Sequence, residues 1–246
     1  MNIDLKFTPP EINQEELIDK NAVSIDVLRA STTIATAIQN KCHQIIPVAE
    51  VETARKLAAF QLRETTLLCG ERGGKRIDGF SLGNSPSEYS IEKIKNKTLI
   101  FTTTNGSRLL TLTQKSKNSL VGSFVNASHI SDFLILDGSD IVILCAGGHD
   151  KFSLEDTVCG GMIIHHVYRS NERNTKLSDT ALAAMILYQK FQNNIPDMLR
   201  LCHHGRYLIE IGMQHDLITC SNVDSVPVIP IFRKGVITLL KEDFFH

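Results

Sequence analysis

Short apolar runs alternate with segments of helical periodicity between residues 22 and 145, and this alternation limits the possible folds more than any other feature. Within residues 50–62, for example, Val51, Ala54, Leu57 and Ala58 recur at the spacing of one helical face. Strands that alternate with helices predict a three-layer α/β/α fold around a largely parallel or mixed central sheet. Strands are predicted at 22–25, 44–49, 66–69, 98–102, 119–124 and 140–145, and helices at 32–41, 50–62, 105–113 and 126–134.

The chain changes character after residue 153. Residues 154–168, 179–191 and 195–211 are predicted to be mainly helical, with residues 170–176 as a polar connector. Two short β-like pieces follow, at 226–231 and 236–240. Because no linker or repeat interrupts the sequence, we expect a single α/β domain over residues 1–246, helix-rich from about residue 153.

Charge and cysteine usage exclude several classes of partner. The net charge of −1 provides no general attraction for nucleic acid or an anionic membrane, so any anion must bind to a local cluster. The six cysteines form no Cys-x-x-Cys pair and sit among apolar neighbours, as expected of reduced, buried thiols. The chain shows neither a signal-peptide pattern nor an apolar stretch of roughly 20 residues. We therefore expect a cytoplasmic protein that binds neither nucleic acid nor membranes.

Polar clusters follow four of the predicted strands, at residues 26–33, 71–85, 102–108 and 147–156. In open α/β sheets, ligands bind beyond the carboxyl ends of the strands, so these clusters are predicted to converge on one site. The second cluster belongs to residues 70–86, GERGGKRIDGFSLGNSP, which contain five glycines. This segment is predicted to be a long functional loop rather than a helix or strand. Its glycines allow close approach of a ligand, and its Arg72, Lys75 and Arg76 can hold an anion.

The cluster at residues 26–33 places Asp26 at a strand end and Arg29 beside the start of the next helix. A helix start offers free N–H groups to a phosphate. The same residues could instead form a helix cap and a local ion pair, with no ligand involved.

The cluster at residues 102–108 is a second candidate anion cradle. Thr103, Thr104, Asn105 and Gly106 supply hydroxyls and turn amides, and Arg108 can point back toward them. The alternative is a threonine cap followed by an ordinary Asn-Gly turn.

Acidic residues in three clusters suggest a metal site. Asp26, Glu71 and one of Glu155 or Asp156 would make an all-oxygen site suited to Mg²⁺. Adjacent helical residues point in different directions, so at most one of Glu155 and Asp156 is expected to face the metal. Asp156 could instead complete a capping box with Ser153.

The histidines lack a metal-binding spacing, and neither His165-His166 nor His203-His204 is expected to place both rings in one site. Arg206, which follows the second pair, is a further candidate anion contact. Residues 70–75 fail as a phosphate-binding P-loop because Arg76 stands where a Ser or Thr would hold Mg²⁺. The chain also lacks a Gly-x-Gly-x-x-Gly after a strand, which disfavours a nucleotide-binding enzyme.

Taken together, the motifs resemble the 2-phosphosulfolactate phosphatase family. The resemblance covers nearly the whole chain in order. Its motifs are IDVLRASTT (25–33), GERGG (70–74), GFSLGNSP (79–86), TTNG (103–106), GSF (122–124), FSLED (152–156), HGR (204–206) and VPV (226–228). Residues 147–151, GGHDK, depart from the family's more usual Thr-Glu-Gly-Arg-like stretch, which bears on the identity of the substrate.

The resemblance implies an α/β/α fold and Mg²⁺-dependent hydrolysis of 2-phospho-3-sulfolactate to sulfolactate and phosphate, a step toward coenzyme M. The substrate would be a small phosphorylated anion. The catalytic set is predicted as Asp26, Arg29 and Glu71, and the metal ligands as Asp26, Glu71, Glu155 and Asp156. Substrate contacts are predicted at Arg72, Lys75, Arg76, Asn84, Ser85, Thr103, Thr104, Asn105, Gly106, Arg108 and Arg206.

Several alternatives stay open from the sequence. The nucleophile could be water or Asp26 itself, through an aspartyl-phosphate. The chain could hydrolyse a different small phosphorylated hydroxy acid, or bind anions without catalysis on the same scaffold. A homodimer is the expected assembly because it is the commonest oligomer.

Overall fold

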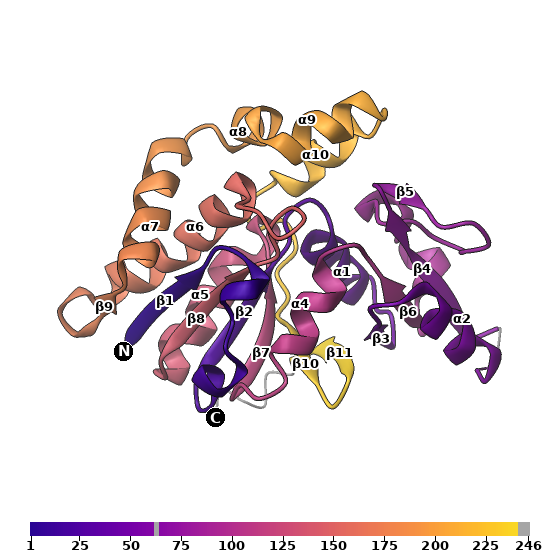
Figure 1. Ribbon diagram of the computed structural model, residues 1–246, viewed down its shortest axis with the longest axis horizontal. Coiled ribbons are helices and arrows are strands. Elements are labelled where there is room, and N and C mark those ends of the chain that lie inside the picture. The colour runs from indigo at the N-terminus through magenta and orange to yellow at the C-terminus, as the bar shows by residue number, and fades with distance from the viewer. Residues whose placement is uncertain (62–63, 241–246) are drawn as a thin grey trace.

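The computed structural model describes residues 1–61 and 64–240, and its centre is one mixed sheet (Figure 1). Position 62, the end of one predicted helix, and residues 241–246 of the predicted domain lie outside the described residues. The strand order is β5-β4-β6-β3-β11-β10-β7-β2-β8-β1-β9. The strands are β1 (Asn2–Lys6), β2 (Asn21–Ile25), β3 (Gln44–Pro47), β4 (Thr66–Arg72), β5 (Lys75–Arg76), β6 (Thr98–Thr102), β7 (Asn118–Gly122), β8 (Ile141–Cys145), β9 (Lys176–Leu177), β10 (Pro230–Arg233) and β11 (Val236–Leu239).

The described strands pair in parallel except where β5, β10 or β11 takes part. The hairpin of β10 and β11 sits between β3 and β7, antiparallel to both. The helices are α1 (Ala30–Gln39), α2 (Val51–Ala59), α3 (Ile91–Ile94), α4 (Gly106–Leu112), α5 (Ala127–Asp137), α6 (Leu154–Ser170), α7 (Asp179–Phe191), α8 (Ile195–Leu201), α9 (His203–Glu210) and α10 (Gln214–Cys220).

Alternating side chains of the strands meet helices on both faces of the sheet. Val23 of β2 and Leu120 of β7 pack in a core with α5, α6 and α7. Ala22, the neighbour of Val23, packs on the other face with Leu109 of α4, and Val121 packs there with α1. Because successive strand residues point to opposite faces, the three-layer α/β/α prediction is confirmed.

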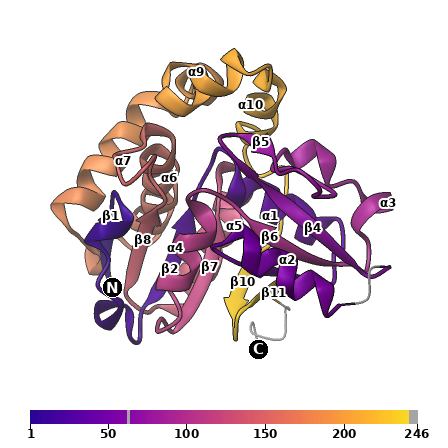
Figure 2. The ribbon, with the colours of Figure 1, turned by 45° about the vertical axis from the view of Figure 1, so that its right-hand side comes forward.

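Helices α8, α9 and α10 lie across the carboxyl ends of the central strands instead of covering a face (Figures 1 and 2). Their buried residues, among them Leu199, Leu208 and Leu217, belong to the same core as α6 and β2. This arrangement roofs the edge of the sheet at which the four polar clusters were expected to meet.

Three predicted elements differ from the structure. The β-like piece predicted at 226–231 is strand only at its last two residues, where β10 begins. Residues 70–76 are not a loop, because β4 continues through Arg72 and turns at Gly73 and Gly74 into β5. Gly70 permits this continuation: it has φ +141°, and a Cβ there would lie 1.9 Å from the Thr102 carbonyl oxygen.

The helix predicted at 195–211 is split at Cys202 into α8 and α9. Cys202 is extended, and its Sγ accepts a hydrogen bond from the Gly205 N–H at the start of α9. The apolar periodicity continues through this break, which is why the sequence suggests one helix. Strands β1 and β9 and helices α3 and α10 were not predicted. In the part of the chain described here, every helix is too short or too polar to span a bilayer.

Candidate active site

A cavity of about 920 Å³ opens between the carboxyl ends of the strands and the roof of α8 and α9. All four polar clusters contribute lining residues, such as Asp26, Glu71, Thr104 and Glu155. The convergence that the topology rule predicts therefore occurs.

Asp26 follows directly after β2, the strand between β7 and β8 in the sheet. Its Oδ1 accepts a hydrogen bond of 3.3 Å from the Ala30 N–H at the start of α1. The pKa of the Asp26 carboxyl is raised to about 7. Burial is the largest cause and the negative charges of Glu71 and Glu155 add to it, whereas the Ala30 N–H and Arg29 act in the opposite direction. Such a carboxyl can hold or release a proton near neutral pH, and it favours a nearby cation.

Glu71 is fixed in place by hydrogen bonds to both carboxylate oxygens. Its Oε2 accepts from the Gly74 N–H at 2.8 Å, within the turn between β4 and β5. Its Oε1 accepts from the N–H and the hydroxyl of Thr104, at 2.8 and 2.9 Å. The side chain is buried, so these bonds hold one orientation toward the cavity.

Glu155 and Asp156 both line the cavity, although they are neighbours at the start of α6. That at most one of them faces a metal ion stays a prediction. Ser153 does cap α6, since its hydroxyl accepts from the Asp156 N–H. The Asp156 carboxylate joins two strand ends, accepting from the N–H groups of Val27 (2.9 Å) and Gly147 (3.2 Å). Burial, with the charges of Glu155 and Asp26, holds the Asp156 pKa well above its usual value.

Arg29 reaches the cavity but is already engaged with protein groups. Its guanidinium forms a buried ion pair with Asp216 of α10, at 2.6 Å, and donates to the Gly74 carbonyl oxygen at 2.6 Å. The local Asp26–Arg29 ion pair considered from the sequence is wrong, because the ion-pair partner that the structure gives Arg29 is the distant Asp216.

Most of the other predicted cations are not among the described residues that line the cavity. Arg72 donates to the carbonyl oxygens of Glu71 and Ala49 and to the Thr102 hydroxyl, which makes it a clamp between strands. Lys75, Arg76 and Arg206 are exposed away from the cavity. Arg108 is exposed as well and pairs with Asp150 at 3.4 Å.

The predicted polar contacts divide in the same way. Thr104, Asn105 and Asn84 line the cavity. The Oδ1 of Asn84 is buried and has no hydrogen-bond partner among the described residues, which suits a group that meets a ligand. Thr103 exchanges hydrogen bonds with Ser107, so the structural alternative holds there.

Two further residues of the predicted set support the site from outside. The Ser85 hydroxyl donates a hydrogen bond of 2.5 Å to Asp216 Oδ1. Gly106 packs against Asp26, and neither Ser85 nor Gly106 is among the described lining residues.

Several cavity residues were missed from the sequence. His203, His204 and Tyr207 of α9 line the roof of the site, so both histidines of this pair face it, contrary to expectation. The His204 and Tyr207 rings stack with centroids 5.9 Å apart, and the Tyr207 hydroxyl donates to the Gly73 carbonyl oxygen. The i, i+3 and i, i+4 spacings of these three residues were a usable signal. Burial lowers the pKa of His204 despite the nearby Glu155, which favours the neutral form of its imidazole.

The charged residues of the lining give the cavity a surplus of negative charge. Asp26, Glu71, Glu155 and Asp156 line it, whereas the fixed cations among the described lining residues are Arg29 and Lys151. Arg29 is in addition neutralised by Asp216. Acidic side chains thus outnumber cationic ones in the lining, and the raised pKa values of Asp26 and Asp156 allow these two carboxyls to hold protons.

Comparison with known proteins places the chain in one family. Residues 6–235 match the sequence model of a protein family that is described as 2-phosphosulpholactate phosphatase. A protein of Caldanaerobacter subterraneus named probable 2-phosphosulfolactate phosphatase is 38% identical over 92% of this chain and 93% of its own length. Proteins with the same name from Symbiobacterium thermophilum (37% identical, 92% of this chain, 97% of its own length) and Clostridium tetani (36%, 96% and 100%) are similar as well. The chain belongs to the 2-phosphosulpholactate phosphatase family.

Proposed function

We propose that the protein is a Mg²⁺-dependent phosphatase that hydrolyses 2-phospho-3-sulfolactate to 3-sulfolactate and phosphate. Family membership supports the reaction type and the substrate class. The observation that carries the metal requirement is the acidic lining of the cavity.

The charges of the substrate and of the site conflict unless a cation accompanies the substrate. Phosphosulfolactate bears roughly four negative charges at neutral pH, about two of them on the phosphate. The cavity offers four carboxylates against Arg29 and Lys151. Because like charges in a partly buried site repel strongly, a divalent cation held by these carboxylates would favour substrate binding.

The carboxylates of the cavity fit a Mg²⁺ ion that has only one or two protein ligands. Among the described residues, no group of three or more His, Cys, Asp or Glu side chains lies close enough to enclose a metal ion. Mg²⁺ commonly uses one or two carboxylates and takes its other ligands from water and phosphate oxygens. Asp26 together with Glu71 or Glu155 would hold it in this way, and when bound it would neutralise the phosphate oxygens.

The remaining groups would orient the substrate. Lys151 and His149, in the hairpin after β8, lie at the side of the cavity where the sulfonate or carboxylate could be received. The Thr104 and Asn105 segment and the amide of Asn84 would contact the phosphate end. Asp26, with its pKa of about 7, would either accept the proton of an attacking water or attack phosphorus itself. Borohydride reduction during turnover distinguishes these routes, because only an aspartyl-phosphate at Asp26 is an acyl phosphate that borohydride reduces to homoserine.

A second substrate is favoured by the same hairpin. Residues 147–151 differ from the family's usual stretch, and Gly147, Gly148, His149 and Lys151 line the cavity, so another small phosphorylated hydroxy acid is the alternative substrate.

The test is a phosphate-release assay on the purified chain with phosphosulfolactate, phospholactate and phosphoglycerate, with Mg²⁺ or with EDTA. We expect release from phosphosulfolactate with Mg²⁺ only, and none from the Asp26→Asn variant. Faster release from a substrate without sulfonate would select the alternative. Absence of release from every phosphomonoester would overturn the proposal and point to a non-catalytic anion-binding protein.

A further inference from the structure

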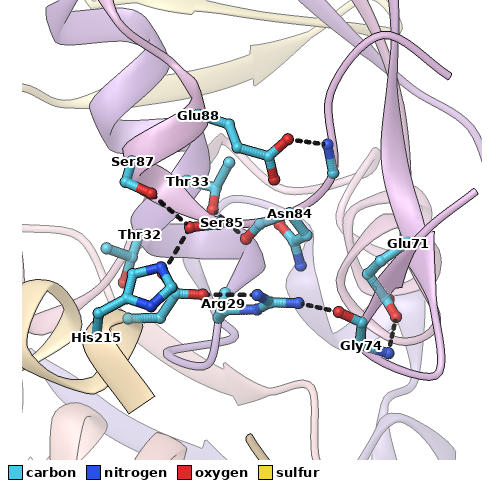
Figure 3. Close-up of polar contacts among 12 residues, drawn as sticks. Arg29, Thr32, Thr33, Glu71, Gly74, Asn84, Ser85, Ser87, Glu88 and His215 are labelled. Atoms are coloured by element: carbon cyan, nitrogen blue, oxygen red, sulfur yellow. Dashed lines mark hydrogen bonds and ion pairs between the residues drawn. The ribbon is translucent and has the colours of Figure 1, made fainter. Parts of the chain in front are cut away.

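A buried ion pair connects the roof of the cavity to its floor. Arg29, after β2, and Asp216, in α10, are 2% and 0% exposed, and their charged atoms lie 2.6 Å apart. Charges so deeply buried are costly to desolvate, and removing one partner strands the other. Figure 3 shows Arg29 lying between Gly74 on one side and His215, the neighbour of Asp216, on the other.

From Arg29 the contacts continue to a carboxylate of the site. The guanidinium that pairs with Asp216 also donates to the Gly74 carbonyl oxygen at 2.6 Å, and the Gly74 N–H donates to Glu71 Oε2 at 2.8 Å (Figure 3). Arg29 therefore holds the carbonyl group of Gly74, and the N–H of the same residue holds Glu71. Gly74 has φ +74°, so a side chain there would strain the backbone, and its Cβ would lie 2.8 Å from the end of the Ile211 side chain, which would have to move.

The second oxygen of Asp216 acts on another wall of the cavity. Its Oδ1 accepts a hydrogen bond of 2.5 Å from the Ser85 hydroxyl. Ser85 is preceded by Asn84, whose amide lines the cavity and whose buried Oδ1 has no partner among the described residues. Asp216 is thus connected to two walls of the cavity. One connection runs through Arg29 and Gly74 to Glu71, and the other runs through Ser85 to Asn84.

We propose that Asp216 is a positioning residue of the active site, which acts through Arg29 and the Gly74 turn on the Glu71 carboxylate. Asp216 is not among the described residues that line the cavity, so it contacts no substrate. The negative charge of Asp216 keeps the Arg29 guanidinium turned toward the Gly74 carbonyl oxygen. Held in this way, the turn presents the Gly74 N–H to Glu71. The kinetic test of this inference rests on the proposed phosphatase function, whereas its structural test does not.

The kinetic experiment is a double-mutant cycle with Asp216→Asn and Glu71→Gln, each of which removes a charge and keeps the shape. We expect Asp216→Asn to lower kcat by ~10- to 100-fold, the usual effect of losing a partner that orients an active-site group, with a smaller change in KM. In the Glu71→Gln background the same substitution should cost little more, because the residue through which it acts is already lost. A residue that only stabilises the fold would lower the melting temperature and reduce kcat by the same factor in both backgrounds, and that result would overturn the proposal.

Two further measurements make the outcome decisive. Glu52→Gln serves as the control, since it removes a carboxylate from the exposed ion pair with Arg55 and should change neither kcat nor the melting temperature. Crystal structures of the wild-type and Asp216→Asn proteins should differ at this turn. In the variant, we expect the Gly74 carbonyl to turn away from Arg29 and the Glu71 carboxylate to be displaced. An unmoved Glu71 refutes the positioning role even if the wild-type protein proves to have no phosphatase activity. Should Asp216→Asn fail to fold, Asp216→Glu tests the same link, because the longer side chain shifts the carboxylate against Arg29, and an unaltered kcat refutes it.

Discussion

The Asp26 carboxylate lies directly against Gly106, the first residue of α4. A Cβ added to Gly106 would lie 2.8 Å from Asp26 Oδ2 and 2.7 Å from the Ala30 Cβ. The start of one helix thus sets how far the acid of the neighbouring strand end can move, and only glycine leaves the room for it.

Gly106→Ala is therefore expected to impair catalysis more than stability. Alanine is the better helix former by ~1 kcal/mol, which offsets part of the crowding, but the added methyl must displace Asp26. We expect a fall in kcat that exceeds the change in melting temperature. Gly122→Ala is the matched control, because its Cβ would meet Val23 at 2.8 Å in the core. It should lower the melting temperature and leave kcat unchanged; the reverse pattern would contradict the role of Gly106.

Asp26→Asn should stabilise the metal-free protein, and more so at high pH. Folding raises the carboxyl pKa from an ordinary 3.8 to about 7, so the folded state binds the proton more tightly than the unfolded state. The stability of the wild type consequently falls as the pH rises from about 4 to 7, by ~4 kcal/mol at most. Asparagine resembles the protonated acid and escapes this loss. Urea unfolding in EDTA at pH 4.5 and pH 8 measures the difference, and parallel pH profiles for the two proteins would rule the mechanism out.

Divalent metal should stabilise the wild-type fold in the absence of substrate. A cation that binds only the folded state at 100 times its Kd adds ~2.7 kcal/mol. Melting curves with and without Mg²⁺ should show this increase for the wild type and a much smaller one for Asp26→Asn. If both proteins respond equally to Mg²⁺, the metal binds away from Asp26.

Lys151→Ala should weaken substrate binding, whereas Lys75→Ala should not. Lys151 lines the cavity, and no ion pair with another described residue neutralises it in the way that Asp216 neutralises Arg29. Lys75 is exposed and is not among the described lining residues. Loss of one charge-assisted contact worth ~1.4 kcal/mol corresponds to a tenfold rise in KM. Steady-state kinetics of the two variants at low ionic strength provide the comparison, and an equal rise in KM for both would show that only the general charge of the surface matters.

The layered fold and the place of the site could be predicted because they depend on local patterns. Apolar runs and helical periodicity mark β2, β8 and α6, and the rule for carboxyl strand ends then brings Asp26, Glu71 and Asp156 together. The roles of the arginines could not be predicted in the same way. The partner of Arg29 is Asp216, 187 residues further along the chain, and no local pattern marks such a contact.

The glycine-rich segment shows a second limit of the sequence. Its composition suggests a loop, but Gly70 continues β4 because the Thr102 carbonyl oxygen of the neighbouring strand occupies the position of a side chain. Whether a glycine ends a strand or allows close packing within it depends on what lies across from it, which is tertiary information. The same holds for α9, where the face that meets the cavity carries His204 and Tyr207, while Arg206 turns to solvent.

The hairpin of β10 and β11 has a consequence for the moment at which the protein becomes active during synthesis. Residues 230–239 separate the strands β3, β4, β5 and β6 from β1, β2, β7, β8 and β9 in the sheet order. Glu71 belongs to the first group, whereas Asp26 and Glu155 follow strands of the second. A nascent chain without this hairpin has its acidic residues on two half-sheets that no described strand pairing joins. Because domains fold as units, we expect this site to be complete only after the central hairpin has been made.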